Sequence, residues 1–296
     1  MDLNSAILYG QLVNEAYNVA TTDLSNHAGQ TVTAGVGASP TTYNVVTSIF
    51  ANDLATDINK MRATITVSIG LVLQSAAGDV VIAIRGTEGI YEWVHDASFL
   101  MVPCPFLAGA GHTEDGFTAM YLSMTTSAMP GSPKLVAALA AIAWPQPVKS
   151  VTICGHSLGG ALATLLALDV AANYSGTAGP AFKQPAVYTY ASPKTGGPVF
   201  ATMYNHVVPN TTRIANRMDL VPKLPLPPLY EHVDALVDLN PIVMGVPPTL
   251  LVKFELACEH ILTSYLYMLS LRAGGAVLPL KAGCAPVGAA ALPPIA

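Results

Sequence analysis

The stretch from Ser150 to Ala171, SVTICGHSLGGALATLLALDVA, decides the fold of this chain. It begins with a run of β-forming residues, passes through the pentapeptide GHSLG at 155–159, and continues as a long series of small and aliphatic residues. The first run predicts a strand, and the apolar series predicts a helix that is buried nearly all round. A single serine therefore lies on the turn between strand and helix, with a glycine two positions away on each side.

This arrangement is typical of a nucleophile elbow, in which a sharp turn projects the Oγ of Ser157 alone above the sheet. The residues two before and two after the serine come side by side in such a turn, which explains Gly155 and Gly159. The helix begins at the serine, so its unpaired N–H groups and the positive end of its dipole face the place where an oxyanion would form. The Leu158 N–H is the first donor expected there. A bare GxSxG motif recurs by chance, and its weight here comes from the strand before it and the helix after it.

A serine at its ordinary pKa needs a base, and the base needs an orienting acid. On this kind of fold the chain order is serine, then Asp or Glu, then His. The stretch TTRIANRMDLVPKLP (211–225) places Asp219 just past an expected strand, before prolines that stop regular structure. His260 stands where a loop meets a helix, from which an imidazole can reach over the sheet edge. We therefore expect Ser157, Asp219 and His260 to form a triad.

Other candidates for the acid and the base are less favoured. His232 is expected within or at the start of a strand, which fixes its side chain to one face, and His206 is expected on a helix in contact with solvent. Asp169 lies within the helix after the elbow and is expected to point elsewhere. Asp234 and Asp238 fall inside the expected strand at 232–239. The alternative interpretation of both is that they are merely surface residues.

Strands alternate with helices from residue 148 onward, which favours a mostly parallel sheet with helices on both faces. Before that point, two adjacent strands are joined by a tight turn, and no element is predicted for residues 21–60. The expected elements are a helix at 6–17, strands at 63–74, 79–85, 148–154, 186–190, 211–215 and 232–239, and helices at 114–129, 133–143, 161–172, 198–206 and 260–271. Residues 1–272 are expected to form one α/β domain, and residues 273–296 an Ala/Gly/Pro-rich C-terminal tail.

Five stretches of the chain resemble, in order and style, the class 3 lipases, which are fungal-lipase-like α/β-hydrolases. They are VVIAIRGTEGIYEWVHD, TICGHSLGGALATLLAL, VYTYASPKTGG, RIANRMDLVPKLP and CEHILTSYL. The resemblance covers about residues 60–272 and implies an α/β-hydrolase fold with the triad Ser157, Asp219 and His260. It also implies that Thr87 supplies an oxyanion contact together with Leu158. The family often has a His where this chain has Glu114, and the segment 220–259 is unusually rich in proline.

The resemblance further implies a lid in residues 88–111, in which Trp93 matches a lid tryptophan. Apolar side chains are frequent in this stretch, among them Ile90, Val94 and Phe99. A wall or cover for an acyl chain is the favoured interpretation of this apolar content, and an ordinary packed loop is the alternative. A lid of this kind would bring the protein into transient contact with a lipid–water interface.

Composition excludes several classes of protein. Hydrophobic residues make up 52% and charged residues 10% of the chain, so it is not disordered, and a net charge of −5 gives no indication of a nucleic-acid partner. No apolar run is long enough for a membrane span. The N-terminus lacks a basic segment and an unbroken apolar run, so no signal peptide is expected. The compartment stays undetermined, with the cytoplasm as the default and secretion by another route or a removed signal as alternatives.

The four cysteines form neither a CxxC pair nor a dense framework, which favours free or buried thiols, with a single disulfide as the alternative. The carboxylates show no metal-ligand spacing, so neither a metal nor a cofactor is expected. The favoured function is hydrolysis of acylglycerols or related lipid esters through an acyl-enzyme. An esterase for small or aromatic esters of the feruloyl type, and a catalytically silent lipid-binding protein, are the alternatives.

Overall fold

The computed structural model describes residues 2–35, 40–54, 64–87, 99–233, 235–244, 256–282 and 284. The helices are α1 (Leu3–Asn18), α3 (Asp115–Ser123), α4 (Leu135–Ala140), α5 (Leu158–Asn173), α6 (Gly179–Phe182), α7 (Pro198–Val207), the 3₁₀ turn η1 (Val221–Lys223), α9 (Leu256–His260) and α10 (Leu262–Ala273). The strands are β1 (Thr31–Ala34), β2 (Thr41–Leu54), β3 (Thr64–Ser75), β4 (Asp79–Ile84), β5 (Met101–Pro103), β6 (His112–Glu114), β7 (Ser150–His156), β8 (Ala186–Tyr190), β9 (Thr211–Asn216) and β10 (Leu236–Leu239).

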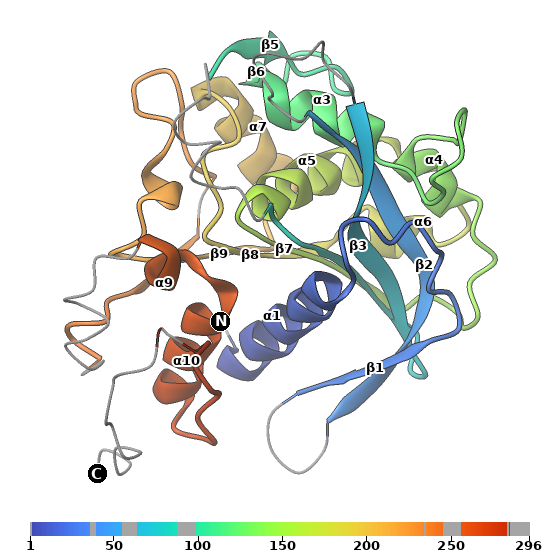
Figure 1. Ribbon diagram of the computed structural model, residues 1–296. Coiled ribbons are helices and arrows are strands. Elements are labelled where there is room, and N and C mark those ends of the chain that lie inside the picture. Colours follow the sequence, from blue (N-terminus) through green and yellow to red (C-terminus); the bar gives the residue numbers. More distant parts are fainter. Residues whose placement is uncertain are drawn as a thin grey trace.

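A central sheet of eight strands organises the molecule, in the order β1-β2-β3-β4-β7-β8-β9-β10 (Figure 1). The first four strands run antiparallel to one another, and β4, β7, β8, β9 and β10 run parallel. Apart from the first residue of each, β4 and β7 are buried along their whole length, as expected for strands covered on both faces. The short strands β5 and β6 form a separate antiparallel pair.

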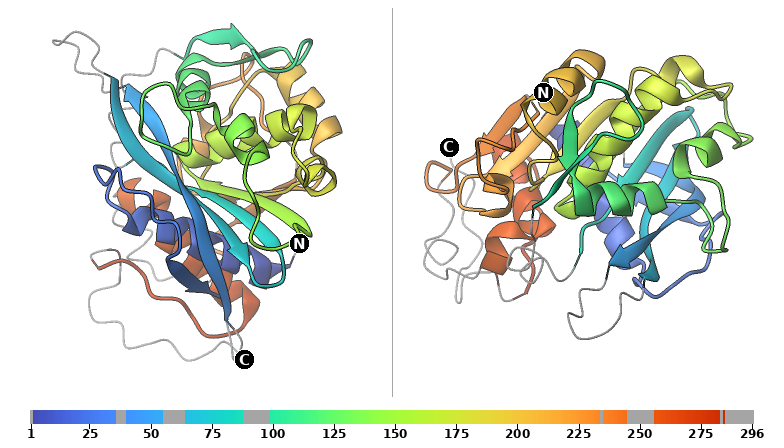
Figure 2. Two further views of the ribbon diagram at one scale, coloured as in Figure 1. Left: turned by 90° about the vertical axis from the view of Figure 1, so that its right-hand side faces the viewer. Right: turned by 90° about the horizontal axis from the view of Figure 1, so that it is seen from above.

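Helices cover both faces of this sheet. Figures 1 and 2 show α3, α4, α5 and α7 on one face and α1 with α10 on the other. Helix α5 is apolar nearly all round, and it fills the first core together with residues of β2, β4 and β7. The second core lies between the opposite face and the pair α1 and α10. The chain therefore has the mostly parallel sheet with helices on both faces that the sequence predicts.

Most expected elements are present, with different ends. The strand 186–190 has the expected bounds, and the strands expected at 148–154 and 211–215 run from Ser150 to His156 and from Thr211 to Asn216. Three predictions are corrected. The helix expected at 114–129 ends at Ser123, and the strand expected at 232–239 begins only at Leu236. The helix expected at 260–271 begins at Leu262, because His260 ends a separate short helix.

Strand β2 is the main element that the sequence did not indicate. Its apolar pattern is interrupted by polar residues, and two of these, Thr47 and Ser48, are buried. Tertiary hydrogen bonds satisfy them: Ser48 Oγ accepts from the main-chain N–H of His27, and Thr47 Oγ1 accepts from the Asn26 amide. The side chains on β2 are therefore compatible with a core position only once residues 26–27 pack beside them.

The favoured prediction of free thiols is wrong for one pair of cysteines. Cys258 and Cys284 form a disulfide, whereas Cys104 and Cys154 are free and buried. Near this disulfide, Leu278 and Leu280 are partly buried against the second core. The first part of the expected tail is thus held on the α1–α10 side of the molecule.

Candidate active site

Ser157 occupies the turn between β7 and α5 in a conformation that L-residues seldom adopt, with φ of 58° and ψ of −128°. Its surroundings must hold it there, because a non-glycine residue at positive φ is strained. The Ser157 side chain is 0% exposed. Leu158 is the first residue of α5, so its N–H belongs to the first turn, whose N–H groups lack partners within the helix.

Three glycines make this turn sterically allowed. A Cβ on Gly155 would lie 2.1 Å from the carbonyl oxygen of Gly159, as the side-by-side arrangement requires. The sequence predicts that a Cβ on Gly159 would collide with residue 155, but the structure places a different atom there. A Cβ there would lie 2.3 Å from the Ile84 carbonyl oxygen, on the neighbouring strand β4. Gly160 lets α5 approach Ser192 just after β8, where a Cβ would lie 2.7 Å from the serine Cβ.

His260 and Asp219 lie beside the serine in one continuous hydrogen-bonded series. The Nε2 atom of His260 is 2.8 Å from the Oγ of Ser157, and its Nδ1 is 2.8 Å from Asp219 Oδ2. A carboxylate can only accept, so Nδ1 carries the proton and Nε2 is left to accept the serine hydroxyl proton. Both side chains are buried, with exposures of 8% for His260 and 2% for Asp219.

Two further contacts hold the carboxylate of Asp219 in this orientation. Its Oδ1 accepts from the main-chain N–H of Val221 in η1 at 2.9 Å. Its Oδ2 accepts from the hydroxyl of Tyr265 on α10 at 2.7 Å, and that hydroxyl accepts from the N–H of Asn216 at 3.0 Å. The aspartate is therefore tied to the end of β9, to its own loop and to α10, while one oxygen faces His260.

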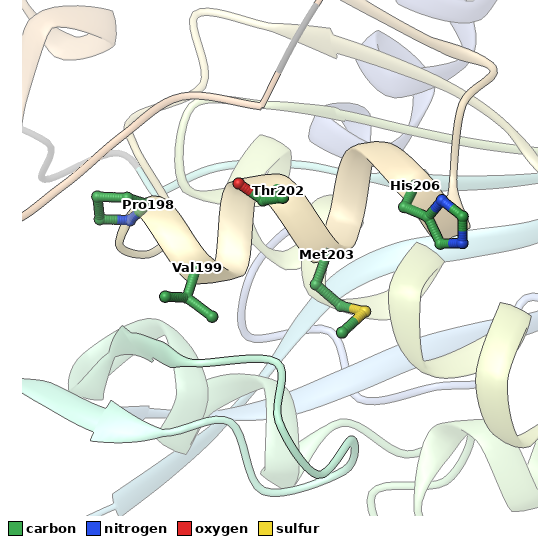
Figure 3. Close-up of a pocket in the computed structure, with 5 residues that line it drawn as sticks. All are labelled: Pro198, Val199, Thr202, Met203 and His206. Atoms are coloured by element: carbon green, nitrogen blue, oxygen red, sulfur yellow. The ribbon is translucent and has the colours of Figure 1, made fainter.

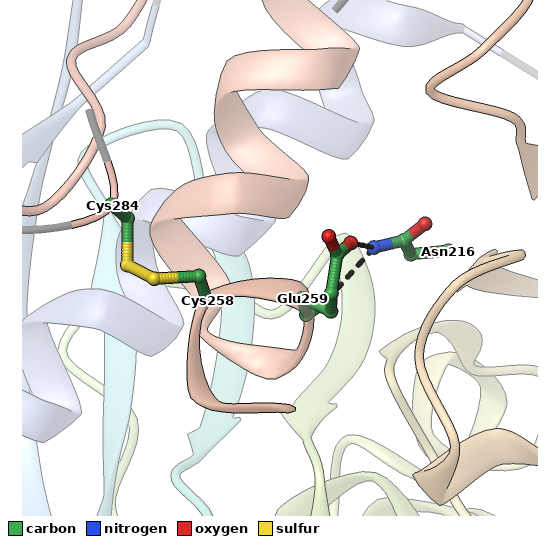
Figure 4. Close-up of a disulfide and its surroundings, with 4 residues drawn as sticks. All are labelled: Asn216, Cys258, Glu259 and Cys284. Atoms are coloured by element: carbon green, nitrogen blue, oxygen red, sulfur yellow. Dashed lines mark hydrogen bonds between the residues drawn. A yellow bond between two sulfur atoms is a disulfide. The ribbon is translucent and has the colours of Figure 1, made fainter. Parts of the chain in front are cut away.

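The segment that carries His260 is fixed by long-range contacts (Figure 4). The Asn216 amide donates to the main-chain oxygen of Glu259 at 2.9 Å and to its carboxylate at 2.8 Å. Cys258 is bonded to Cys284 on the other side of the same short helix. Burial raises the pKa of Glu259, and the nearby Asp219 carboxylate raises it further, against the lowering effect of the Asn216 hydrogen bond.

Thr87 follows the end of β4, in the segment next to the elbow. A Cβ on Gly86 would lie 2.8 Å from the Cβ of Ser157, so the Arg85–Thr87 segment packs directly against the serine. The guanidinium of Arg85, which is buried, donates from Nη1 to the Gly86 carbonyl at 3.1 Å and from Nε to the Ser68 carbonyl. These bonds fix the main chain just before Thr87. Thr87 and Leu158 thus flank Ser157 from two different elements.

The other histidines and aspartates lie in different surroundings. His232 precedes β10 and donates from Nε2 to the Pro222 carbonyl; burial, followed by the charge of Arg213, lowers its pKa to about 3. His206 is exposed on α7. The other candidate aspartates have different partners. Asp169 accepts from the hydroxyl of Tyr121, and Asp238 forms an ion pair with Arg217. Asp234 lies outside the described residues.

Of the expected lid residues, Ile90, Trp93 and Val94 lie outside the described residues. Phe99 is described, and it adopts a positive φ of 46°. Its carbonyl oxygen accepts from the hydroxyl of Tyr230 at 2.9 Å, and the two rings meet edge to face. The middle of the 88–111 stretch is therefore bonded, at Phe99, to the proline-rich segment that follows Asp219.

Glu114, where the resembled family often has a histidine, caps helix α3. Its carboxylate accepts from the Phe117 N–H at 2.7 Å, and burial raises its pKa. A groove of about 410 Å³ runs along α7 (Figure 3) and is lined by Pro198, Val199, Thr202, Met203 and His206. None of Ser157, Asp219 and His260 lines it. Among the residues that the structure describes, no three His, Cys, Asp or Glu side chains gather as metal ligands.

Several residues at the site were not recognised from the sequence: Tyr17, Arg85, Asn216, Glu259 and Tyr265. They are ordinary members of amphipathic or β-rich patterns, and their hydrogen bonds reach residues distant in the chain. Only Arg85 carried a signal, because it belongs to the Arg-Gly-Thr triplet of the resembled family. Its position as a buried cation at a strand end marks it as a support for the main chain.

The model of the family described as lipase (class 3) matches residues 81–228, which is half of the chain. This protein therefore belongs to the class 3 lipase family. Phospholipase A1-II 3 of Oryza sativa subsp. indica is 33% identical over 56% of this chain and 43% of its own length. A secreted mono- and diacylglycerol lipase of Fusarium solani is 28% identical over 76% of this chain and 59% of its own length. The chain thus spans about half the length of the curated relatives it matches.

Solved structures give the same fold. The Lip2 lipase from Yarrowia lipolytica has a TM-score of 0.56 at 20% identity, over 80% of this chain and 78% of that one. A second fungal lipase has a TM-score of 0.59 at 22% identity, over 80% of both chains. At such identities the likeness concerns the fold, which is that of the α/β-hydrolases.

Proposed function

We propose that this protein is a serine carboxylic ester hydrolase that acts on acylglycerols or related lipid esters through an acyl-enzyme. The observation that carries the proposal is the series Asp219–His260–Ser157, with two hydrogen bonds of 2.8 Å between buried side chains. This connectivity is what activation of a serine hydroxyl requires. The silent-binder alternative gives no reason for a buried carboxylate, imidazole and hydroxyl to be aligned in this way.

In the proposed reaction, Ser157 Oγ attacks the ester carbonyl while its proton passes to His260 Nε2. The imidazolium is stabilised by Asp219, which keeps its orientation through Val221 and Tyr265. The oxyanion is stabilised by the Leu158 N–H and by Thr87. His260 then gives its proton to the leaving alcohol. Water, activated by the same imidazole, attacks the acyl-enzyme and regenerates Ser157.

A lipid ester is the substrate class that the surroundings favour. The relatives named above are phospholipases A1 and mono- and diacylglycerol lipases. On this chain, apolar side chains project into solvent from the stretches that flank the site. They are Leu100 within the 88–111 stretch, Val199 at the start of α7, and Leu220, Leu226 and Leu229 after Asp219, all between 46% and 68% exposed.

These exposed residues favour contact with a lipid surface while the ester is processed. Leu100 and Leu229 are joined through Tyr230, whose hydroxyl donates to the Leu100 carbonyl, and Gly197 packs against the Leu229 main chain. Because Ser157 is fully buried, an ester can reach its Oγ only after a covering segment moves. We propose that the 88–111 stretch, with Ile90, Trp93, Val94 and Phe99, is that cover. Among the described helices, none has the length and apolarity of a bilayer span.

The test combines a covalent probe with a substrate series. A fluorophosphonate should label the wild type and leave Ser157→Ala unlabelled, and kcat of that variant should fall by on the order of 10⁶. A Ser157→Ala variant with a tenth of the wild-type turnover would exclude the serine mechanism.

The substrate class is tested with p-nitrophenyl esters from acetate upward, emulsified triglyceride, diacylglycerol and phospholipid. Each buried methylene contributes about 0.8 kcal/mol, so kcat/KM should rise up to about fourfold per carbon. The rise should end at about six to ten carbons for a pocket of ordinary size. A preference for acetate, without activity on any lipid, would reject the lipase proposal and favour the small- or aromatic-ester alternative.

A further inference from the structure

His156 precedes the proposed nucleophile, and both of its ring nitrogens are hydrogen-bonded although the side chain is only 3% exposed. Its Nε2 lies 2.7 Å from the main-chain oxygen of His260. Its Nδ1 lies 2.8 Å from the hydroxyl of Tyr17, in the last turn of α1. That hydroxyl also accepts from the N–H of Gly86 at 2.9 Å. The reaction proposed above uses neither the His156 nor the Tyr17 side chain.

The two ends of this series fix the position of every proton in it. An N–H group can only donate, and a main-chain carbonyl can only accept. A neutral His156 must therefore carry its proton on Nε2, and its Nδ1 must accept from the Tyr17 hydroxyl. Burial, and then the neighbouring His260, hold the pKa of His156 well below its usual range, so the ring is neutral at pH 7. The hydrogen bonds thus run in one direction, from Gly86 through Tyr17 and His156 to His260.

At its Gly86 end, the series holds the main chain that leads from β4 to Thr87. The Tyr17 hydroxyl binds the N–H of the Arg85–Gly86 peptide, and Arg85 Nη1 binds the carbonyl of the next peptide at 3.1 Å. That second peptide also contains the N–H of Thr87. Because a trans peptide is planar, with its C=O and N–H pointing in opposite directions, holding both peptides fixes the direction of the Thr87 N–H.

The other end holds the main chain of His260, whose ring centroid is 4.9 Å from that of His156. This residue ends α9, and a single residue separates it from the start of α10. The hydrogen bond to the His260 carbonyl restrains the main chain that carries the imidazole, and the hydrogen bond to Asp219 restrains the orientation of the ring. The series therefore connects the oxyanion side of the site to its base, across the elbow that carries Ser157.

We propose that Tyr17 and His156 are positioning residues that keep Thr87 and His260 in register with Ser157 through this single series of hydrogen bonds. The proposal rests on the hydrolase function proposed above. Both residues act through others, since neither of their polar groups contacts the Ser157 hydroxyl. A displacement of about 1 Å costs about 10²-fold in rate, and oxyanion contacts strengthen only toward the transition state. The loss should therefore fall on kcat and leave KM almost unchanged.

The first experiment compares two Tyr→Phe variants that each remove one hydrogen-bonded hydroxyl from the contacts of α1. Tyr17→Phe interrupts the series, whereas the Tyr190 hydroxyl donates to the Ala6 carbonyl of the same helix and takes no part in it. With p-nitrophenyl butyrate, kcat of Tyr17→Phe should fall about 10- to 100-fold with KM within about twofold, on the scale of a lost oxyanion donor. Tyr190→Phe should lose a comparable amount of thermal stability and keep kcat within about threefold of the wild type, well under that scale. Equal kcat values for the two variants would overturn the proposal.

The second measurement needs no activity and no variant. Nitrogen NMR of histidine-labelled wild-type protein should show a neutral His156 with its proton on Nε2 and a hydrogen-bonded Nδ1 at pH 7. A protonated ring, or a proton on Nδ1, would overturn the proposal even if Tyr17→Phe fails to fold. If the wild type hydrolyses no ester while this tautomer is found, the proposed function fails and the hydrogen-bonded series stands. If esters are hydrolysed and Tyr17→Phe behaves like Tyr190→Phe, the positioning proposal alone fails.

Discussion

The two partners of the Ser157–His260 hydrogen bond are held in place by opposite means. Ser157 depends mainly on residues close to it in the chain, because Gly155 packs against Gly159 and α5 begins one residue later, while Gly159 also makes room for Ile84 of β4. His260 depends on residues far along the chain. Asp219 is 41 residues away and binds its ring, and His156 is 104 residues away and binds its carbonyl. A nucleophile can thus be built into a short sequence, whereas its base must be brought to it by the assembled fold.

The largest expected effect separates His260 from His232, the partly buried histidine that precedes β10. His260→Ala should lower kcat by on the order of 10⁶, about as much as Ser157→Ala, because base and nucleophile act as one unit. His232→Ala should keep kcat within a few-fold on that scale, since its Nε2 serves the Pro222 carbonyl. Steady-state kinetics on one ester checks both, and the reverse ranking would move the base to His232.

The next effect tests the disulfide that fixes the His260 side. Replacing both Cys258 and Cys284 by Ala opens a closed segment of 26 residues. The chain-entropy relation gives a loss of about 3.5 kcal/mol in the free energy of unfolding. We expect kcat to fall several-fold more than KM rises, because Cys258 is two positions from His260, the proposed base.

Denaturant unfolding and kinetics with and without dithiothreitol measure this loss. The wild type in dithiothreitol should approach the double variant, and the double variant should not respond to the reductant. A variant with unchanged stability and unchanged kcat would show that α9 is held without the disulfide.

A smaller effect tests the elbow side. Gly155→Ala forces a Cβ to within 2.1 Å of the Gly159 oxygen, so either the turn or α5 must shift. Overpacking of this kind costs about 1–3 kcal/mol, and a displaced Oγ lowers kcat as well. Gly179→Ala is the matched control, because an added Cβ there has no heavy atom within 4 Å. Thermal unfolding should rank Gly155→Ala well below both the control and the wild type, and equal unfolding midpoints would contradict the steric argument.

The smallest effect is a pH dependence at the loop that bears Asp219. His232 has a pKa lowered to about 3 in the folded protein by burial, against about 6.5 when unfolded. Between these two pKa values the unfolded chain binds more protons than the folded protein does. The contribution of His232 to stability is therefore complete above about pH 6.5 and is lost as the pH falls toward about 3. The part of this contribution to the free energy of unfolding that is lost between pH 7.5 and 6 should be under about 1 kcal/mol.

Urea unfolding at several pH values measures this contribution of His232 to the free energy of unfolding. His232→Gln should have a flatter decline than the wild type below pH 6.5, while substitution of the exposed His206 by Gln should leave the decline unchanged. An identical decline in His232→Gln would mean that His232 does not contribute to the acid sensitivity.

Those parts of the site whose geometry is mainly local could be predicted from the sequence. The elbow is a property of residues 155–160, and its glycines, its strand and its buried helix can all be read within one short stretch. The placement of Asp219 and His260 follows from chain order and from the ends of elements. Both side chains lie where that order predicts, although the helix boundary at His260 differs.

The partners that hold these residues could not be predicted from the sequence and are seen only in the folded chain. Tyr17 meets His156 across 139 residues, Tyr265 meets Asp219 across 46, and the pairing of Cys258 with Cys284 was not favoured at all. Strand β2 was missed for the same reason, since its buried Thr47 and Ser48 need partners from another segment. A pattern of apolar residues reports which face of an element is buried. It carries no information on which distant hydroxyl, amide or thiol will satisfy a polar group there, because that choice is made only when the two segments pack together.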